Sequence, residues 1–189
     1  ASAKNEFVNA LKYDPQHIPS LYSLGIIYMK NEDSDDAASN FKAILEIDPD
    51  NHDAHYNMGL LYYKDEKYDD AITEFKEALD KRNENADIYY NMGLAYFKKK
   101  LFEDAISSFK NTLNTKNKHV DALHELGNSY NSIGNHEKAI SLFNKVLTLS
   151  PKNATCYFHL GNAYRADKKR NEAHSAYKKA IEINSNYAE

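Results

Sequence analysis

One stretch of the chain decides its fold. Residues 52–85 read HDAHYNMGLLYYKDEKYDDAITEFKEALDKRNEN, and residues 86–119 repeat the pattern as ADIYYNMGLAYFKKKLFEDAISSFKNTLNTKNKH. Both stretches carry a Met-Gly-Leu triplet, a tyrosine three residues after the glycine, and an alanine followed four residues later by a phenylalanine. A fixed period of roughly 20 to 50 residues indicates a repeat architecture, in which each unit buries its apolar face against its neighbours.

The same period of 34 residues extends outward through the rest of the chain. Five of the six glycines keep it, namely Gly25, Gly59, Gly93, Gly127 and Gly161. Pairs of a small and an aromatic residue keep it as well: Ala37 and Phe41, Ala71 and Phe75, Ala105 and Phe109, Ala139 and Phe143, Ala173 and Tyr177. Spacings of i to i+4 place each set on one helical stripe, so each unit is predicted to form two amphipathic helices. The glycine and alanine lack bulk and let these helices approach closely.

With these columns the chain resembles the tetratricopeptide repeat, a helix-turn-helix unit of 34 residues. The resemblance covers essentially the whole chain and implies an all-α fold, an α-α superhelix or right-handed solenoid of stacked helix pairs. In this frame residues 1–17 are the second helix of a truncated repeat, and residues 188–189 begin a further one. The complete repeats are expected at 18–51, 52–85, 86–119, 120–153 and 154–187. We therefore expect the chain to be a segment of a longer array.

The chain departs from the family pattern at the turn between the two helices of a unit. The family's turn glycine appears only as Gly134, and its place elsewhere is taken by Glu32, Glu66, Lys100 and Lys168. Because glycine adopts the conformation of such a turn more readily than other residues, we expect these four turns to cost slightly more to form.

The composition argues against several classes of partner and location. Among 189 residues, 28 are Asp or Glu and 24 are Lys or Arg, a net charge of −4 that disfavours nucleic acid and anionic membrane surfaces. No segment approaches the roughly 18 consecutive apolar residues of a membrane span, so we expect no membrane insertion. The single cysteine, Cys156, fits a reducing compartment. We expect a cytoplasmic protein, with a cytoskeletal or nuclear assembly as the open alternative.

The resemblance implies a concave groove, lined by the first helices of the units, that binds peptide segments of other proteins. The fifth, ninth and twelfth positions of each repeat are expected to face this groove, and in the first three complete repeats they are aromatic or aliphatic. We call these nine residues the apolar strip: Tyr22, Ile26, Met29, Tyr56, Leu60, Tyr63, Tyr90, Leu94 and Phe97. An apolar patch on a surface usually marks a partner site, although packing between repeats is the alternative reading. Asn57 and Asn91, at the sixth position, are predicted to align the peptide backbone, and Asn128 begins a polar part of the groove.

The sequence shows no constellation that supports catalysis, a cofactor or a metal. His52 and His55 lie on one helical face, but no Cys or His cluster completes the four ligands of a structural zinc site. A second group, predicted to form a solvated polar pocket without a nucleophile, comprises His124, Glu125, Asn128, Asn131 and His159. There is also no glycine-rich phosphate loop. We therefore expect a protein that is not an enzyme and has neither cofactor nor metal.

Family members that bind chaperone C-terminal tails hold the terminal carboxylate with lysine, arginine and asparagine at set positions. Asn57 and Asn91 match two of those positions, but no Lys or Arg stands at the others. Asp121 and Glu125 occupy positions where cations are required and would repel a carboxylate. The sequence argues against chaperone tails as ligands.

The favoured hypothesis is a non-catalytic scaffold that binds an apolar peptide or helix of a partner protein as part of a multiprotein assembly. One alternative is the substrate-recruiting arm of a larger enzyme, since protein O-glycosyltransferases contain long arrays similar to this chain. A second is a self-association module, in which the apolar strip or the ends of two copies pack together into a homo-oligomer.

Overall fold

The computed structural model describes residues 3–79 and 85–188. In these ranges the chain contains helices and no strand, which confirms the all-α prediction. It divides into two compact units, residues 1–84 (the first unit) and residues 85–189 (the second unit).

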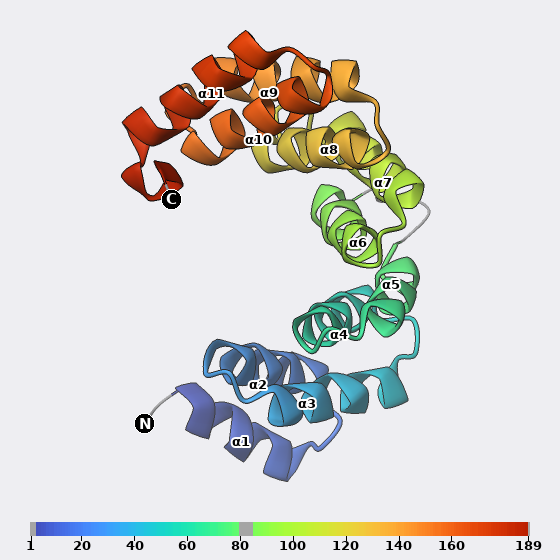
Figure 1. The fold of residues 1–189 in the computed structure, drawn as a ribbon. Helices are drawn as coiled ribbons and strands as arrows, with labels where there is room; N and C mark the ends of the chain where they lie inside the picture. The colour runs from blue at the N-terminus through green and yellow to red at the C-terminus, as the bar shows by residue number, and fades with distance from the viewer. Residues whose placement is uncertain (1–2, 80–84, 189) are drawn as a thin grey trace. The chain divides into compact units, whose positions relative to one another are not determined.

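The described part of the first unit consists of five helices (Figure 1). They are α1 (Ala3–Tyr13), α2 (Ile18–Lys30), α3 (Ser34–Ile47), α4 (His52–Lys64) and α5 (Tyr68–Glu77). Helices α2 and α3 form one antiparallel pair and α4 and α5 the next, and α3 packs on α4. Helix α1 packs on α2 and completes a layered stack.

The second unit continues the same arrangement over residues 85–188 (Figure 1). Its elements are α6 (Ala86–Lys98), α7 (Phe102–Thr115), α8 (Val120–Ser132), α9 (His136–Leu149), α10 (Ala154–Ala166), α11 (Arg170–Ile183) and a short 3-10 helix, η1 (Ser185–Ala188). Each pair packs on the next through α7 against α8 and α9 against α10. Among the described helices of the whole chain, none is both long and apolar enough to cross a membrane.

The periodic aromatic residues form the centre of each helix pair. Phe41, Phe75, Phe109 and Phe143 are completely buried. Each phenylalanine lies against the glycine of the facing helix, and a Cβ atom added to Gly59 would lie 2.6 Å from the ring of Phe75. Such a distance is too short for any side chain, so the glycine column is required by helix contact, as the sequence pattern indicated.

The turns between paired helices adopt the left-handed backbone conformation that the sequence pattern implied. The backbone φ angles are 65° at Glu32, 60° at Glu66, 61° at Lys100 and 62° at Lys168, against 79° at Gly134. In each turn the amide that follows this residue donates to a carbonyl five residues back, for example Lys67 N to Tyr62 O at 2.9 Å. This is the hydrogen bond of a Schellman motif, which normally favours glycine.

Candidate functional site

The first unit presents six residues of the apolar strip from two equivalent helices. Tyr22, Ile26 and Met29 lie on α2, and Tyr56, Leu60 and Tyr63 lie on α4. All six side chains are partly exposed. The Tyr22 ring lies 6.1 Å from that of Phe41, and the Tyr56 ring lies 6.0 Å from that of Phe75 (centroid distances). Each tyrosine therefore rests on the core and keeps part of its surface accessible.

The contrast between Leu60 and Leu61 separates the strip from the core on α4. Leu61 is only 5% exposed and belongs to the hydrophobic core around Phe41, whereas Leu60 is partly exposed. Ile26 also contacts that core while remaining partly exposed. Packing against the core thus accounts for part of the strip's apolar character but leaves surface available.

The other three strip residues, Tyr90, Leu94 and Phe97, lie on α6 of the second unit and are likewise partly exposed. The Tyr90 ring stacks on the imidazole of His119, with centroids 4.8 Å apart and planes inclined by 29°. Phe97 meets Phe102 edge to face at 5.4 Å. These contacts restrict the orientations of the Tyr90 and Phe97 rings.

The asparagines predicted to align a peptide backbone are bonded to their own helices. Asn57 is 4% exposed, and its Nδ2 donates to the carbonyl of Asp53 at 2.7 Å. Asn91 makes the same bond to the carbonyl of Asp87 at 2.9 Å but is more exposed. Asn91 is consequently the more accessible of the two amides.

Four of the five residues in the predicted polar group come together between α8 and α10. Asn128 donates from Nδ2 to Glu125 Oε2 at 3.1 Å, and its Oδ1 accepts from His159 Nδ1. His124 Nδ1 lies 3.4 Å from Glu125 Oε1, and the rings of His124 and His159 are 4.8 Å apart. The fifth residue, Asn131, pairs instead with His136 Nδ1 at 2.7 Å.

The charge states of this polar group follow from its burial. Burial, and then the neighbouring His124, lower the pKa of His159 to about 4, so this imidazole is neutral at physiological pH. Burial of Glu125 would raise the pKa of its carboxyl, but the hydrogen bonds from His124 and Asn128 outweigh burial and lower it. The group is therefore a hydrogen-bonded network around the Glu125 carboxylate, in which His159 is neutral. It contains no hydroxyl or thiol nucleophile.

The histidines considered as metal ligands are occupied by other partners. His55 Nδ1 lies 2.7 Å from Glu74 Oε2 and its Nε2 lies 2.8 Å from the carbonyl of Pro49. His52 Nδ1 lies 3.3 Å from the carbonyl of Glu77. Within residues 3–79 and 85–188, no group of three or more His, Cys, Asp or Glu side chains could hold a metal ion.

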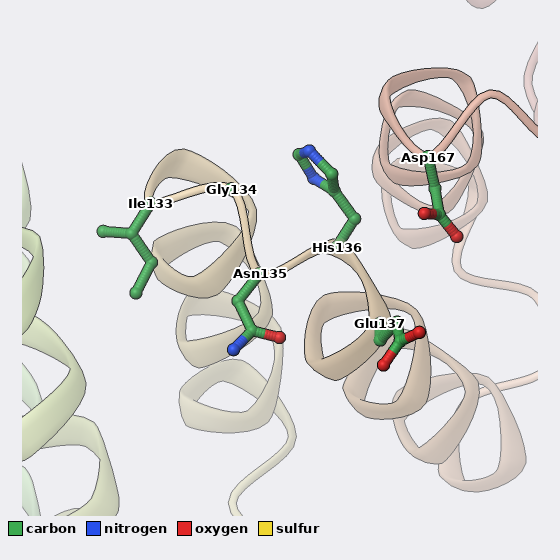
Figure 2. Close-up of a pocket in the computed structure, with 6 residues that line it drawn as sticks. All are labelled: Ile133, Gly134, Asn135, His136, Glu137 and Asp167. Carbon is green, nitrogen blue, oxygen red and sulfur yellow. The ribbon is translucent and has the colours of Figure 1, made fainter.

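A separate polar pocket lies at the turn between α8 and α9 (Figure 2). Its lining residues are Ile133, Gly134, Asn135, His136, Glu137 and Asp167. His136 is engaged with Asn131, and Asp167 Oδ2 lies 2.7 Å from Lys169 Nζ. Because His136 and Asp167 make these local contacts and the lining contains no hydroxyl or thiol, we interpret the pocket as part of the junction between neighbouring repeats.

Sequence reasoning missed the contacts made by Tyr187 and the pairing of His55 with Glu74. Tyr187 packs on Phe158, with ring centroids 5.3 Å apart, and its hydroxyl lies 2.7 Å from Thr155 Oγ1. Tyr187 follows Phe158 by 29 residues, as His119 follows Tyr90, so the repeat register contains the signal. The pairing of His55 with Glu74 could not be found from the repeat pattern, because no other repeat has a histidine and a glutamate at these two positions.

Comparisons with known proteins agree with this fold. A family model described as TPR repeat matches residues 27–66 and 61–100, and one described as Tetratricopeptide repeat matches residues 84–152 and 119–186. No curated protein matches the chain significantly. Two crystal structures of MamA are similar to it. The first is 28% identical, with a TM-score of 0.83 over 90% of this chain and 93% of that chain. The second is 30% identical, with a TM-score of 0.80 over 87% and 96%.

The fold is also shared by the crystal structure of YrrB, described as a TPR protein with an unusual peptide-binding site. The two chains are 22% identical, with a TM-score of 0.87 over 97% of this chain and 94% of that chain. This likeness concerns the fold alone. The family models together span residues 27–186, most of the sequence. The chain therefore belongs to the tetratricopeptide repeat family.

Proposed function

We propose that the chain is a non-catalytic interaction scaffold that binds an apolar peptide or helix of a partner protein on the apolar strip. The observation that carries the proposal is the partial exposure of all nine strip side chains in the folded units. A folded protein that keeps aligned aromatic and aliphatic residues accessible usually uses them for association. The peptide-binding site described for YrrB supports peptide recognition as a role of this fold.

The strip has enough apolar surface for binding of moderate strength. Burying one large apolar side chain contributes roughly 1.5 to 3 kcal/mol. After the entropy cost of association, a few such anchors correspond to a dissociation constant on the order of micromolar. Of the two asparagines predicted to align a peptide backbone, Asn91 is assigned to that role in this proposal, because Asn57 is buried and bonded to its own helix. Asn128 belongs to the polar part of the predicted groove.

The proposal includes the absence of catalysis and a cytoplasmic location. The chain's one thiol, Cys156, is buried, and burial raises its pKa to about 12. A thiol of that pKa is almost fully protonated at neutral pH, so it is a poor nucleophile. The lone cysteine also fits a reducing compartment.

The test is the double variant Leu60→Asp with Leu94→Asp in a partner-capture experiment with the intact protein. Two carboxylates on the strip should abolish capture, while the helical circular dichroism and the melting temperature change little. Leu149→Asp is the matched control, since Leu149 is 43% exposed and lies on α9, outside the strip. It should leave capture unchanged. Loss of the fold in the double variant would reassign Leu60 and Leu94 to the core and remove the proposed surface.

A further inference from the structure

The modest net charge of the chain conceals a large difference between its two units. Residues 1–84 contain 18 Asp and Glu against 9 Lys and Arg, a net charge of −9. Residues 85–189 contain 10 acidic and 15 basic residues, a net charge of +5. The first unit is therefore strongly acidic and the second basic.

At several equivalent positions of the repeat, the side chain is acidic in the first unit and basic in the second. Glu66 and Lys100 stand 34 residues apart and have φ angles of 60° and 61°. Asp65 and Lys99 occupy equivalent helix ends with φ near −78° and −75°. Asp50 and Lys118, two repeats apart, are both exposed loop residues. Because the same backbone accepts either charge, folding does not require acidic residues in the first unit.

Acidic residues of the first unit flank α4 at both ends and follow the end of α2, next to Lys30 and Lys64 in the last turns of these helices. Glu32 and Asp33 follow the end of α2, and Asp65 and Glu66 follow the end of α4. Asp48 and Asp50 lie in the loop that precedes α4. Lys67 lies 3.4 Å from Asp65, and this exposed pair offsets little of the total. The strip residues of α4 thus have carboxylates near both ends of their helix, and Lys30, Lys64 and Lys67 offset part of this charge.

We propose that the apolar strip of the first unit binds a cationic amphipathic segment of a partner protein. The inference rests on the proposed function and specifies the chemistry of the ligand. Apolar side chains of the segment would lie on Tyr22, Ile26, Met29, Tyr56, Leu60 and Tyr63, and lysines or arginines beside them would meet the carboxylates at the helix ends. Such complementarity increases the association rate and excludes acidic competitors.

The direct experiment uses three fluorescent peptides of about 20 residues with leucines at helical spacing. The remaining positions are lysine in one peptide, glutamine in the second and glutamate in the third. Fluorescence anisotropy with the full chain should show the lysine peptide binding at least about tenfold more tightly than the glutamine peptide, and the glutamate peptide more weakly than either. The lysine preference should shrink at high salt, because exposed charges are screened.

Charge-reversed variants locate the preference on the first unit. The quadruple variant Glu32→Lys, Asp50→Lys, Asp65→Lys and Glu66→Lys introduces the lysines that the second unit carries at equivalent positions. It should lose the preference for the lysine peptide. The matched control, Lys99→Asp, Lys100→Glu, Lys118→Asp and Lys168→Glu, should retain it. Circular dichroism of both variants checks that the fold is kept.

The outcomes separate this inference from the proposed function. Equal affinity for the three peptides, abolished by Leu60→Asp with Leu94→Asp, would overturn the cationic ligand and leave the scaffold intact. Peptide binding that is insensitive to the leucine variant would contradict the proposed function itself. A concentration-dependent dimer in sedimentation, dispersed by the first quadruple variant, would place a second copy of this chain on the surface and also overturn the inference.

Discussion

The glycine column illustrates how a single residue fixes the distance between two helices. In Gly59→Ala the added methyl group would lie 2.6 Å from the buried Phe75 ring. Alanine gains roughly 0.5 to 1 kcal/mol of helix propensity, but overpacking in a core costs typically about 1 to 3 kcal/mol. We expect a net loss of about 1 kcal/mol in the free energy of unfolding, measured by urea titration. The double variant Gly59→Ala with Phe75→Leu should cost less than the sum of the two single variants. Strict additivity would show that the methyl group does not contact the ring.

The left-handed turn residues allow the opposite prediction at the same scale. Lys100→Gly should stabilise the protein by about 0.5 to 1 kcal/mol, because glycine adopts a φ of 61° without the steric cost of a Cβ atom. Urea unfolding measures the gain. Lys99→Gly is the matched control, since Lys99 has a φ of −75°. Glycine there relieves no left-handed strain and adds entropy to the unfolded state, so it should not stabilise the protein. Equal effects of both substitutions would remove the conformational explanation.

At the scale of elements, the contact between α8 and α10 predicts acid sensitivity. The pKa of His159 is about 4 in the folded protein against a reference of 6.5. Below pH 6.5 the unfolded chain therefore takes up a proton that the folded chain rejects, and stability falls as the pH drops towards 4. Each pKa unit corresponds to about 1.4 kcal/mol. With partial solvent screening we expect a loss of about 1 to 2 kcal/mol between pH 7.5 and pH 5.

Urea unfolding at the two pH values measures this loss. His159→Asn introduces the asparagine that Asn57 and Asn91 provide at equivalent positions, and it should remove most of this loss of stability. His174→Asn replaces an exposed histidine of α11 and should leave it in place. Glu125, whose lowered pKa contributes stability that is lost only below about pH 4.5, acts outside this interval. An unchanged acid response in His159→Asn would assign the response to other groups.

The elements themselves could be predicted from the sequence, because each depends on local spacing. Helix starts are marked by capping side chains such as Asn51, whose Oδ1 accepts from the amide of Ala54 at 3.1 Å. The column of Phe75 predicted the core for the same reason. By contrast, the pairing of His55 with Glu74 depends on how two helices approach, which spacing does not specify. Asn57 was predicted at the groove, yet its burial depends on neighbouring side chains that no column records.

At the scale of the whole molecule, one net charge and one composition describe two units with different properties. The excess of acid in the first unit was present in the sequence but disappeared in the sum over all residues. Summing the charge separately for residues 1–84 and 85–189 reveals this acidic excess. The residues with shifted pKa values are also divided between the two units. His55 lies in the first unit, whereas His159 and Glu125 lie in the second. The two units should therefore respond to pH in opposite directions.

The pH response of each unit can be measured by hydrogen exchange with mass spectrometry, after correction for intrinsic exchange rates. Burial lowers the pKa of His55, but its bonds to Glu74 and Pro49 outweigh burial and raise the pKa above 6.5. Its stabilising contribution is complete below pH 6.5 and is lost as the pH rises through the folded pKa. Lowering the pH from 8 to 5.5 should thus increase protection in α4 and α5 and decrease it in α8 and α10. His55→Gln should abolish the gain without affecting the loss. Parallel changes in both units would mean that a global charge effect outweighs these local contacts.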